Sequence, residues 1–150
     1  MKFMTGAELA SFTQGLISAK KQHGTFSVDL TVSSISRVLS GGSLDFGGSE
    51  YKEAGAIALE PEKKSAGEPY GWWNLAPGSY LVTYNEKLNP GEEGVIVVLP
   101  HERLVAAGGS HSPLVVEKLD ETVHVLLQVG KEGLKIKENA RVSKAVVIID

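Results

Sequence analysis

The residues best suited to metal binding or catalysis are four histidines, His23, His101, His111 and His124, in a chain that has no cysteine. None of them has the HExxH or HxH spacing that brings two imidazoles to one metal ion. His101 and His111 flank a Gly-rich turn, which leaves a loop-borne metal site open, but ordinary loop or partly buried histidines are the commoner interpretation. The missing cysteines exclude disulfide scaffolds, thiolate zinc sites and Cys nucleophiles. We therefore predict no metal site.

Other residues that often do chemistry lack the required context. The pair Trp72 and Trp73 could stack on a nucleobase, although two tryptophans beside a turn are more typical of core or interface packing. The glycines around Gly108 form neither a Walker loop nor a dinucleotide loop. No serine stands in a nucleophile elbow, since Ser79 simply follows a Pro-Gly turn. Spacing alone therefore identifies no catalytic centre.

The N-terminal segment predicts one amphipathic helix over residues 5–21. Thr5 and Glu8 have the spacing of a capping box, in which two side chains satisfy free backbone N–H groups. Apolar residues then recur at intervals of three and four and form one stripe, which consists of Leu9, Phe12, Leu16 and Ile17. Gly24 is a natural stop.

The rest of the chain predicts short strands separated by turns. Residues 25–32 alternate polar with apolar side chains, the signature of a half-buried strand. Further strands are expected at residues 57–59, 73–75, 79–84, 95–99, 114–116, 122–129, 134–137 and 142–149, with a loop at 40–51 and an exposed excursion at 60–71. This pattern favours a mainly β barrel or sandwich in one domain spanning residues 1–150, preceded by the helix.

Composition narrows the class of partner. The 150 residues carry a formal net charge of −3 and are 42% hydrophobic. A general nucleic-acid or anionic-membrane binder needs a basic excess or a dense basic patch, so we expect neither partner. Apolar runs such as 95–99 are far too short to cross a bilayer. The first residues lack the pattern of a signal peptide, and we expect a cytoplasmic protein.

Five segments, taken in order, resemble the dCTP deaminase/dUTPase family. Residues 22–30 end in the Ser-Val-Asp-Leu strand of the family's first motif, and residues 75–82 are similar to its "PGEFVL" strand. Residues 86–90, 126–136 and 138–148 resemble "LEYVELP", "LELVNLGKKPIVL" and "PGMRIAQLVF". Each segment alone is weak evidence, and their order along most of the chain carries the resemblance.

The resemblance implies a distorted, jelly-roll-like β-barrel that assembles as a homotrimer, with nucleotide sites at subunit boundaries. It also implies deamination of dCTP or diphosphate hydrolysis of dUTP, with Mg²⁺ carried by the bound deoxyribonucleoside triphosphate. The apolar C-terminal strand at 146–149, which a barrel edge would have to cover, gives the assembly modest physical support.

The chemical positions depart from the family pattern. Residues 100–108 correspond to the loop and helix "GRSSLARLG", in which an Arg, a Ser and a second Arg lie near the triphosphate and the base. Here those positions hold His101, Glu102 and Ala106, and a carboxylate at Glu102 would repel phosphate oxygens. Gly108 matches the family, and Arg103 could compensate if the loop shifts by one residue. The resemblance thus makes His101, Arg103 and Gly108 the candidate nucleotide-binding residues.

Three further departures predict a degenerate or inactive centre. The "DPGYxG" motif is missing between Ser112 and Val123, and Val125 stands where the deaminase has its catalytic Glu. The sequence stops at Asp150, just after the last expected strand, so the arm that closes over the nucleotide is expected to be absent. Asp29 and Glu102 are weak catalytic candidates, and Asp29 could equally make a structural hydrogen bond. The open interpretations are a divergent dCTP or dUTP hydrolase, or a non-catalytic homotrimeric nucleotide-binding or scaffold protein.

Overall fold

The N-terminal segment forms two short helices. The computed structural model covers residues 1–150, and β1 (Lys2–Phe3) is followed by α1 (Gly6–Phe12) and α2 (Ala19–Gln22). The expected cap is present, since the Glu8 N–H donates to Thr5 Oγ1 over 3.2 Å. The N-terminal helix is therefore confirmed, but its predicted extent over 5–21 is wrong.

Pairing with another segment ends α1 early. Gln14 forms a β-bridge with Lys87, and Gly15 adopts φ 82°, a left-handed conformation that a continuous helix cannot contain. The predicted apolar stripe is divided as a result. Leu9 is fully buried, whereas Phe12 and Ile17 remain exposed.

Most strands follow the alternating segments of the sequence, but the strand expected at residues 25–32 runs from residue 28 to residue 40. The strands are β2 (Val28–Ser40), β3 (Gly55–Ala58), β4 (Trp72–Leu75), β5 (Gly78–Tyr84), β6 (Gly94–Pro100), β7 (Gly109–Ser110), β8 (Leu114–Val116), β9 (Val125–Val129), β10 (Leu134–Lys137) and β11 (Arg141–Ile149). One short helix, α3 (Glu102–Ala107), lies between β6 and β7. No helix of the protein has the length and apolar character needed to cross a lipid bilayer.

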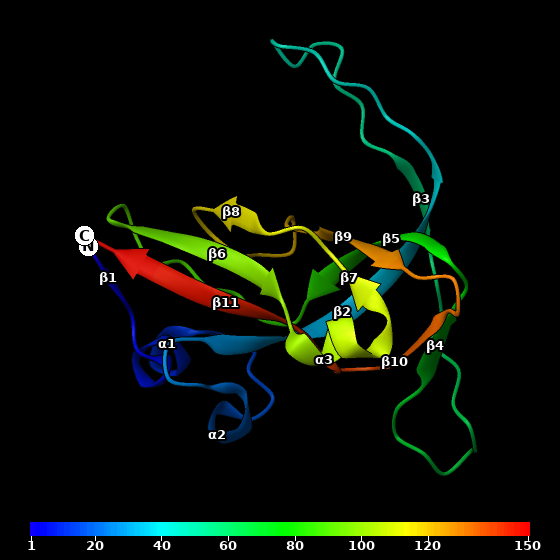
Figure 1. The fold of residues 1–150 in the computed structure, drawn as a ribbon, viewed down its shortest axis with the longest axis horizontal. Coiled ribbons are helices and arrows are strands. Elements are labelled where there is room, and N and C mark those ends of the chain that lie inside the picture. The colour runs from blue at the N-terminus through cyan, green and yellow to red at the C-terminus, as the bar shows by residue number, and fades with distance from the viewer.

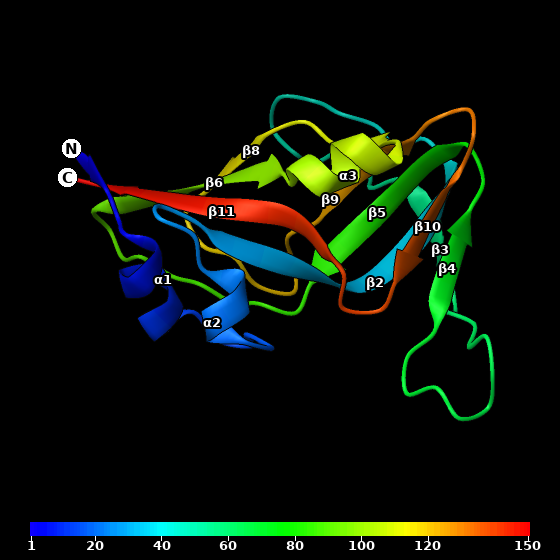
Figure 2. The same ribbon diagram turned by 60° about the horizontal axis from the view of Figure 1, so that its bottom comes forward.

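The strands form one strongly curled sheet that resembles half a barrel (Figures 1 and 2). Its order is β7-β9-β5-β2-β11-β6-β8, with β1 added to β11 and β3 added to β2. Strands β4 and β10 form a separate antiparallel pair. The prediction of a mainly β, jelly-roll-like fold with an N-terminal helix is confirmed.

The core lies inside the curl, where alternate residues of the strands meet. On β5 and β9, for example, Tyr80, Val82, Val125 and Leu127 are buried, while the residues between them are more exposed. The end of β2 continues with β3 into an arm that projects from the body (Figure 1). The termini lie side by side, because β1 pairs with the end of β11. This arrangement brings α3, β10 and the start of β11 together.

Candidate functional site

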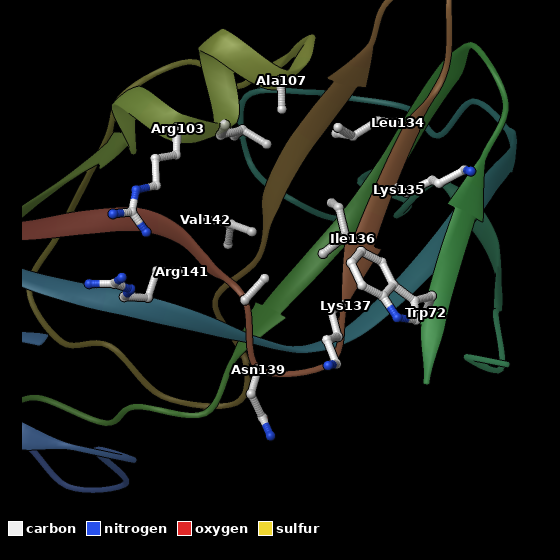
Figure 3. Close-up of a pocket in the computed structure, with 12 residues that line it drawn as sticks. Trp72, Arg103, Ala107, Leu134, Lys135, Ile136, Lys137, Asn139, Arg141 and Val142 are labelled. Atoms are coloured by element: carbon white, nitrogen blue, oxygen red, sulfur yellow. The ribbon is translucent and has the colours of Figure 1, made fainter. Parts of the chain in front are cut away.

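A cavity of about 360 Å³ lies between α3, β10 and the turn into β11 (Figure 3). Four cationic side chains line it: Arg103, Lys135, Lys137 and Arg141. No aspartate or glutamate is among its lining residues. Its remaining walls are apolar apart from Asn139 and the indole of Trp72. Such a lining favours an anionic ligand.

The secondary structure explains how these four residues come to line one cavity. On β10, Leu134 and Ile136 are buried. Lys135 and Lys137 alternate with them and therefore extend from the opposite face of the strand. Arg141 is the first residue of β11, which follows β10 after a short turn. Arg103 comes from α3, and its guanidinium and that of Arg141 extend to the same side of the cavity (Figure 3).

His101 caps α3 and does not line the cavity. Its Nδ1 accepts the Arg103 N–H over 3.0 Å, so the proton of the neutral ring lies on Nε2. That Nε2 faces Oδ2 of Asp29 at 3.4 Å, and both side chains are almost completely buried. Both ring nitrogens are therefore engaged within the protein. His101 orients the first turn of α3, and with it Arg103.

Asp29 also holds Arg141. The Arg141 Nη1 donates to Asp29 Oδ2 over 3.3 Å and to the Lys21 carbonyl over 3.1 Å. Asp29 thus connects the N-terminus of α3 with one cationic wall of the cavity. Its own carboxylate is not part of the cavity lining.

Glu102 is separated from the cavity as well. Its Oε2 lies 2.8 Å from Lys144 Nζ, and its side chain is exposed to solvent. The hydrogen bond from Lys144 lowers the pKa of Glu102 to about 2, so this carboxylate is ionised and weakly basic at neutral pH. The lysine also neutralises the charge that the sequence places beside the expected phosphate site.

Two further positions from the sequence analysis are Gly108 and Val125. Gly108 ends α3 with φ 110°, and its backbone N–H caps the helix. It does not line the cavity. Val125 is buried in β9, so no carboxylate replaces it from that strand. Of the sequence-predicted site residues, only Arg103 borders the cavity.

The two tryptophans have different environments. Trp73 is buried, and its indole N–H donates to the Leu59 carbonyl over 2.9 Å, so it is a core residue. Trp72 is half-buried in the cavity wall, with Lys64 Nζ at 4.4 Å and Lys137 Nζ at 5.6 Å from its ring centroid. These contacts are cation–π interactions, and they keep positive charge close to the cavity.

No group of three or more His, Asp or Glu side chains is placed to hold a metal ion. His111 is buried and contacts Ser143 Oγ at 2.8 Å, which makes it a packing histidine of the core. A cation-lined cavity without carboxylates also does not fit a Mg²⁺ ion held by the protein itself.

A buried carboxylate outside the cavity was not identified from the sequence. Glu86 is fully buried and accepts hydrogen bonds from the Thr31 N–H, the Thr31 hydroxyl and the Gln22 amide. Burial raises the pKa of Glu86 above its usual value. The partners of Glu86 are distant from it in the sequence, so the sequence pattern alone could not distinguish Glu86 from an exposed residue after β5.

The comparisons with known proteins give a distant match to the family that the sequence motifs resemble. The sequence matches no family model. It is 28% identical over 117 residues to the probable deoxyuridine 5′-triphosphate nucleotidohydrolase of Methanosarcina mazei. The match covers 77% of this chain and 65% of that relative, which is just under two thirds of its length. This similarity supports a distant relationship with the dUTPase family.

Proposed function

We propose that this protein is a dUTPase-related member of pyrimidine deoxyribonucleotide metabolism that binds a deoxyribonucleoside triphosphate and turns over dUTP or dCTP slowly or not at all. The observation that carries the proposal is the cavity with four cationic side chains and no carboxylate in its lining. The similarity to a probable deoxyuridine triphosphate nucleotidohydrolase supplies the class of ligand.

The cavity offers groups for each part of such a ligand. The guanidinium groups of Arg103 and Arg141 can each bind a phosphate through two parallel hydrogen bonds. The Oδ1 of Asn139 already accepts from Asn85, which leaves the Asn139 amide N–H groups for a ligand. Trp72 borders the same space with an aromatic surface on which a base can stack.

The same geometry argues against efficient catalysis. Deamination and hydrolysis both need a group that takes a proton from the attacking water. The carboxylate of Asp29 is occupied by His101 and Arg141, and the carboxylate of Glu102 is paired with Lys144. Loss of a positioned acid or base typically lowers a rate by about 10²–10⁴-fold.

The proposed assembly is a homotrimer. Its support is the resemblance of the ordered motifs to the dCTP deaminase/dUTPase family, together with an apolar outer surface on β6 and β11. The alternative of a non-catalytic scaffold without a nucleotide differs from the main proposal in one measurable property, which is binding of dUTP or dCTP.

Calorimetric titration with dUTP and dCTP, with and without Mg²⁺, tests the binding. We expect saturable binding that becomes about 10–100-fold weaker in Arg103→Ala, because a hydrogen-bonded charge is lost from the cavity. The matched control is Arg37→Ala, which removes an arginine of β2 outside the cavity lining. No detectable binding of either nucleotide would favour the scaffold interpretation.

Chromatography of the same mixtures tests the chemistry. We expect little or no dUMP from dUTP and little or no dUTP from dCTP. Robust turnover that disappears in Asp29→Ala or Glu102→Ala would show that one of these carboxylates is catalytic, and the enzyme interpretation would then replace this one.

A further inference from the structure

A second, smaller cavity of about 180 Å³ lies beside the first, between α2, the loop before β4 and the turn into β11. The two cavities share Asn139 and Arg141 in their linings. Lys21 is a second cation of the smaller cavity, which also has no aspartate or glutamate in its lining. This lining, like that of the larger cavity, favours a ligand group that is negatively charged or accepts hydrogen bonds. Its other lining residues are Ile17, Ser18, Gln22, Thr31 and Tyr70.

Asn139 lies at the boundary between the two cavities. It belongs to the turn between β10 and β11 and has φ 66°, and it is the one residue other than glycine with a positive φ. Figure 3 shows its amide extending away from the ring of Trp72, which borders the larger cavity. Asparagine adopts this left-handed conformation more readily than most residues, and glycine adopts it without strain. The backbone of the turn therefore does not require an amide here.

A series of hydrogen bonds joins this amide to the buried carboxyl group of Glu86. Asn139 Oδ1 accepts from the Asn85 amide over 2.9 Å. The Asn85 amide also donates to Thr31 Oγ1 over 2.9 Å. The Thr31 hydroxyl in turn donates to Glu86 Oε2. We call these four residues the Glu86 network: Glu86, Thr31, Asn85 and Asn139.

Glu86 fixes the direction of each hydrogen bond in this network. Its Oε1 accepts from the Thr31 N–H over 2.7 Å, and its Oε2 accepts from the Gln22 amide over 3.0 Å. Because the single hydroxyl proton of Thr31 is also donated to Glu86, Thr31 Oγ1 can only accept from a further partner. This turns the amide nitrogen of Asn85 toward Thr31 and Asn139. The oxygen of Asn139 therefore faces the network, and its NH₂ group faces away from it.

The boundary between the cavities is consequently rich in donors. The Asn139 amide bonds within the protein through its oxygen, so its two N–H groups are free to donate to a ligand. The side chains of Arg141 and Lys21 carry donors and no acceptor. The hydroxyl groups of Ser18 and Tyr70 can take either role. A ligand group that accepts hydrogen bonds is matched here, and a group that donates them is not.

We propose that Glu86 is a positioning residue that acts through its network, and that Asn139 is a specificity residue that selects a ligand group able to accept hydrogen bonds. The inference rests on the proposed function and names the chemistry that the boundary selects. A phosphate oxygen and a carbonyl oxygen of a base both have this chemistry, whereas the amino group that distinguishes cytosine from uracil does not. Where Asn139 meets the base, it favours dUTP over dCTP. Where it meets a phosphate, it treats the two nucleotides alike.

Calorimetric titration with dUTP, dCTP and inorganic triphosphate tests the role of Asn139. The mildly alkaline pH of the titration favours the ionised form of Glu86. Asn139→Gly keeps a residue that tolerates the positive φ and removes the amide. We expect it to weaken dUTP binding about 10-fold, because one hydrogen bond to the ligand is lost. In Asn139→Asp the free donor becomes an acceptor, so binding should be weaker still, also at high salt, where charge repulsion is screened.

A double-mutant cycle tests whether Glu86 acts through Asn139. Gln at position 86 can donate as well as accept, so Glu86→Gln should release the direction of the network and weaken dUTP binding by up to the same factor. In the Asn139→Gly background it should have no further effect on affinity. A purely structural role would give additive losses. Glu92→Gln, at an exposed position, is the matched control and should bind as the wild type does.

A second pair of variants keeps the test open if Glu86→Gln does not fold, which circular dichroism shows. Thr31→Val removes the hydroxyl from the middle of the network, and Thr31→Ser retains it. We expect Thr31→Val to lose dUTP affinity as Asn139→Gly does, and Thr31→Ser to bind as the wild type does. Equal affinities of the two Thr31 variants would contradict the network.

NMR of the side-chain amides tests the direction of the network without a ligand. The protons of the Asn85 amide should exchange slowly with water, because Thr31 Oγ1, the Val32 carbonyl and Asn139 Oδ1 accept from it. The protons of the Asn139 amide should exchange rapidly. In Thr31→Val this difference should shrink, since both amides can then rotate. Slow exchange at Asn139 and rapid exchange at Asn85 in the wild type would overturn the assigned direction.

The three ligands identify the oxygen that Asn139 meets. Equal losses for all three in Asn139→Gly assign a phosphate oxygen, and a loss confined to the nucleotides assigns a base carbonyl. Unchanged affinities for all three, or a larger loss for dCTP than for dUTP, overturn the selection by Asn139. Such a result leaves the proposed function intact, provided that the wild type binds and Arg103→Ala binds weakly. A wild type that binds none of the three ligands overturns the proposed function and this selection together.

Discussion

At the scale of single residues, Asp29 contacts two residues beside the cavity and does not line the cavity itself. Its carboxylate lies against His101 on one side and Arg141 on the other, and it is almost completely buried. Its Oδ2 is directed at His101, which caps α3, and at Arg141, which lines the cavity.

We therefore expect Asp29→Asn to weaken nucleotide binding and to lower stability. Loss of the charge releases Arg141 from its place and leaves a buried network incompletely paired, which typically costs about 1–3 kcal/mol. The affinity for dUTP should fall by up to about 10-fold, because Arg141 is displaced and not deleted. Urea unfolding and calorimetric titration measure the two effects, with the exposed Asp150→Asn as control. Unchanged affinity would show that Arg141 does not depend on Asp29.

Glu86 makes a second prediction at this scale, on pH. Its folded-state pKa is raised by burial, so the folded protein holds this proton at pH values at which the unfolded chain has lost it. The contribution to stability is therefore fully present below pH 4.5, the ordinary value, and is lost as the pH rises through the folded-state pKa. Glu86→Gln cannot titrate, so the stability advantage of the wild type over this variant should be greater below pH 4.5 than at neutral pH. Urea midpoints of both proteins across this range measure it, and a pH-independent difference would contradict it.

The candidate cavity was only partly predictable from its residues. Arg103 was identified because it could replace a missing phosphate-binding arginine if the loop shifts by one residue, and it does line the cavity. The alternating segment 134–137 predicted a strand that carries Lys135 and Lys137, but alternation indicates only that both lysines share one face of that strand. That they share a cavity with Arg103 depends on where α3 lies relative to β10, and nothing local to residues 134–137 specifies that position.

At the scale of elements, the strands were predictable because period-two alternation is a local property. The segment 79–84 alternates buried and partly exposed residues and became β5. The helix was predicted too long because its second half satisfies the same spacing rule as its first. The end of the first helix is set by a contact that is distant in the sequence, because Gln14 pairs with Lys87.

The break between α1 and α2 leads to a prediction about Gly15. A Cβ at this position would lie 2.3 Å from the Asn85 carbonyl oxygen, and φ 82° disfavours any side chain. Gly15→Ala should therefore destabilise the protein by about 1–3 kcal/mol, the usual range for overpacking. Gly67→Ala is the control, because nothing lies within 4 Å of a Cβ there and its φ is unexceptional. Equal unfolding midpoints for the two variants would mean that the backbone at Gly15 can relax.

At the scale of the whole molecule, charge is distributed unevenly in a way that composition conceals. The net charge of −3 argues against a general polyanion binder, yet four cations share one cavity whose lining has no carboxylate. Composition averages over the surface, whereas a ligand responds to the local field of the cavity. The exclusion of nucleic acid on net charge and the proposal of a small anionic ligand are therefore compatible.

This uneven charge predicts how ligands change the thermal stability of the whole protein. A ligand that binds only the folded state at 100 times its Kd adds about 2.7 kcal/mol of stability. For a domain of this length that corresponds to a rise in Tm of about 5–10 °C. We expect dUTP to produce such a rise and deoxyuridine, which lacks the phosphates, to produce almost none.

The salt dependence of the thermal shift distinguishes binding through cation–phosphate attraction from binding through burial of the base. The Debye length falls from about 10 Å at 0.1 M salt to about 3 Å at 1 M, so a site that depends on cation–phosphate attraction should lose most of its effect. The thermal shift with dUTP should therefore shrink strongly at high salt, and it should be small at every salt concentration in the double variant Arg103→Ala/Arg141→Ala. Differential scanning fluorimetry with dUTP, deoxyuridine and pyrophosphate measures the contributions of the base and of the phosphates. An equal shift with dUTP and deoxyuridine would place the binding energy on the base and Trp72, and the cations would then have another role.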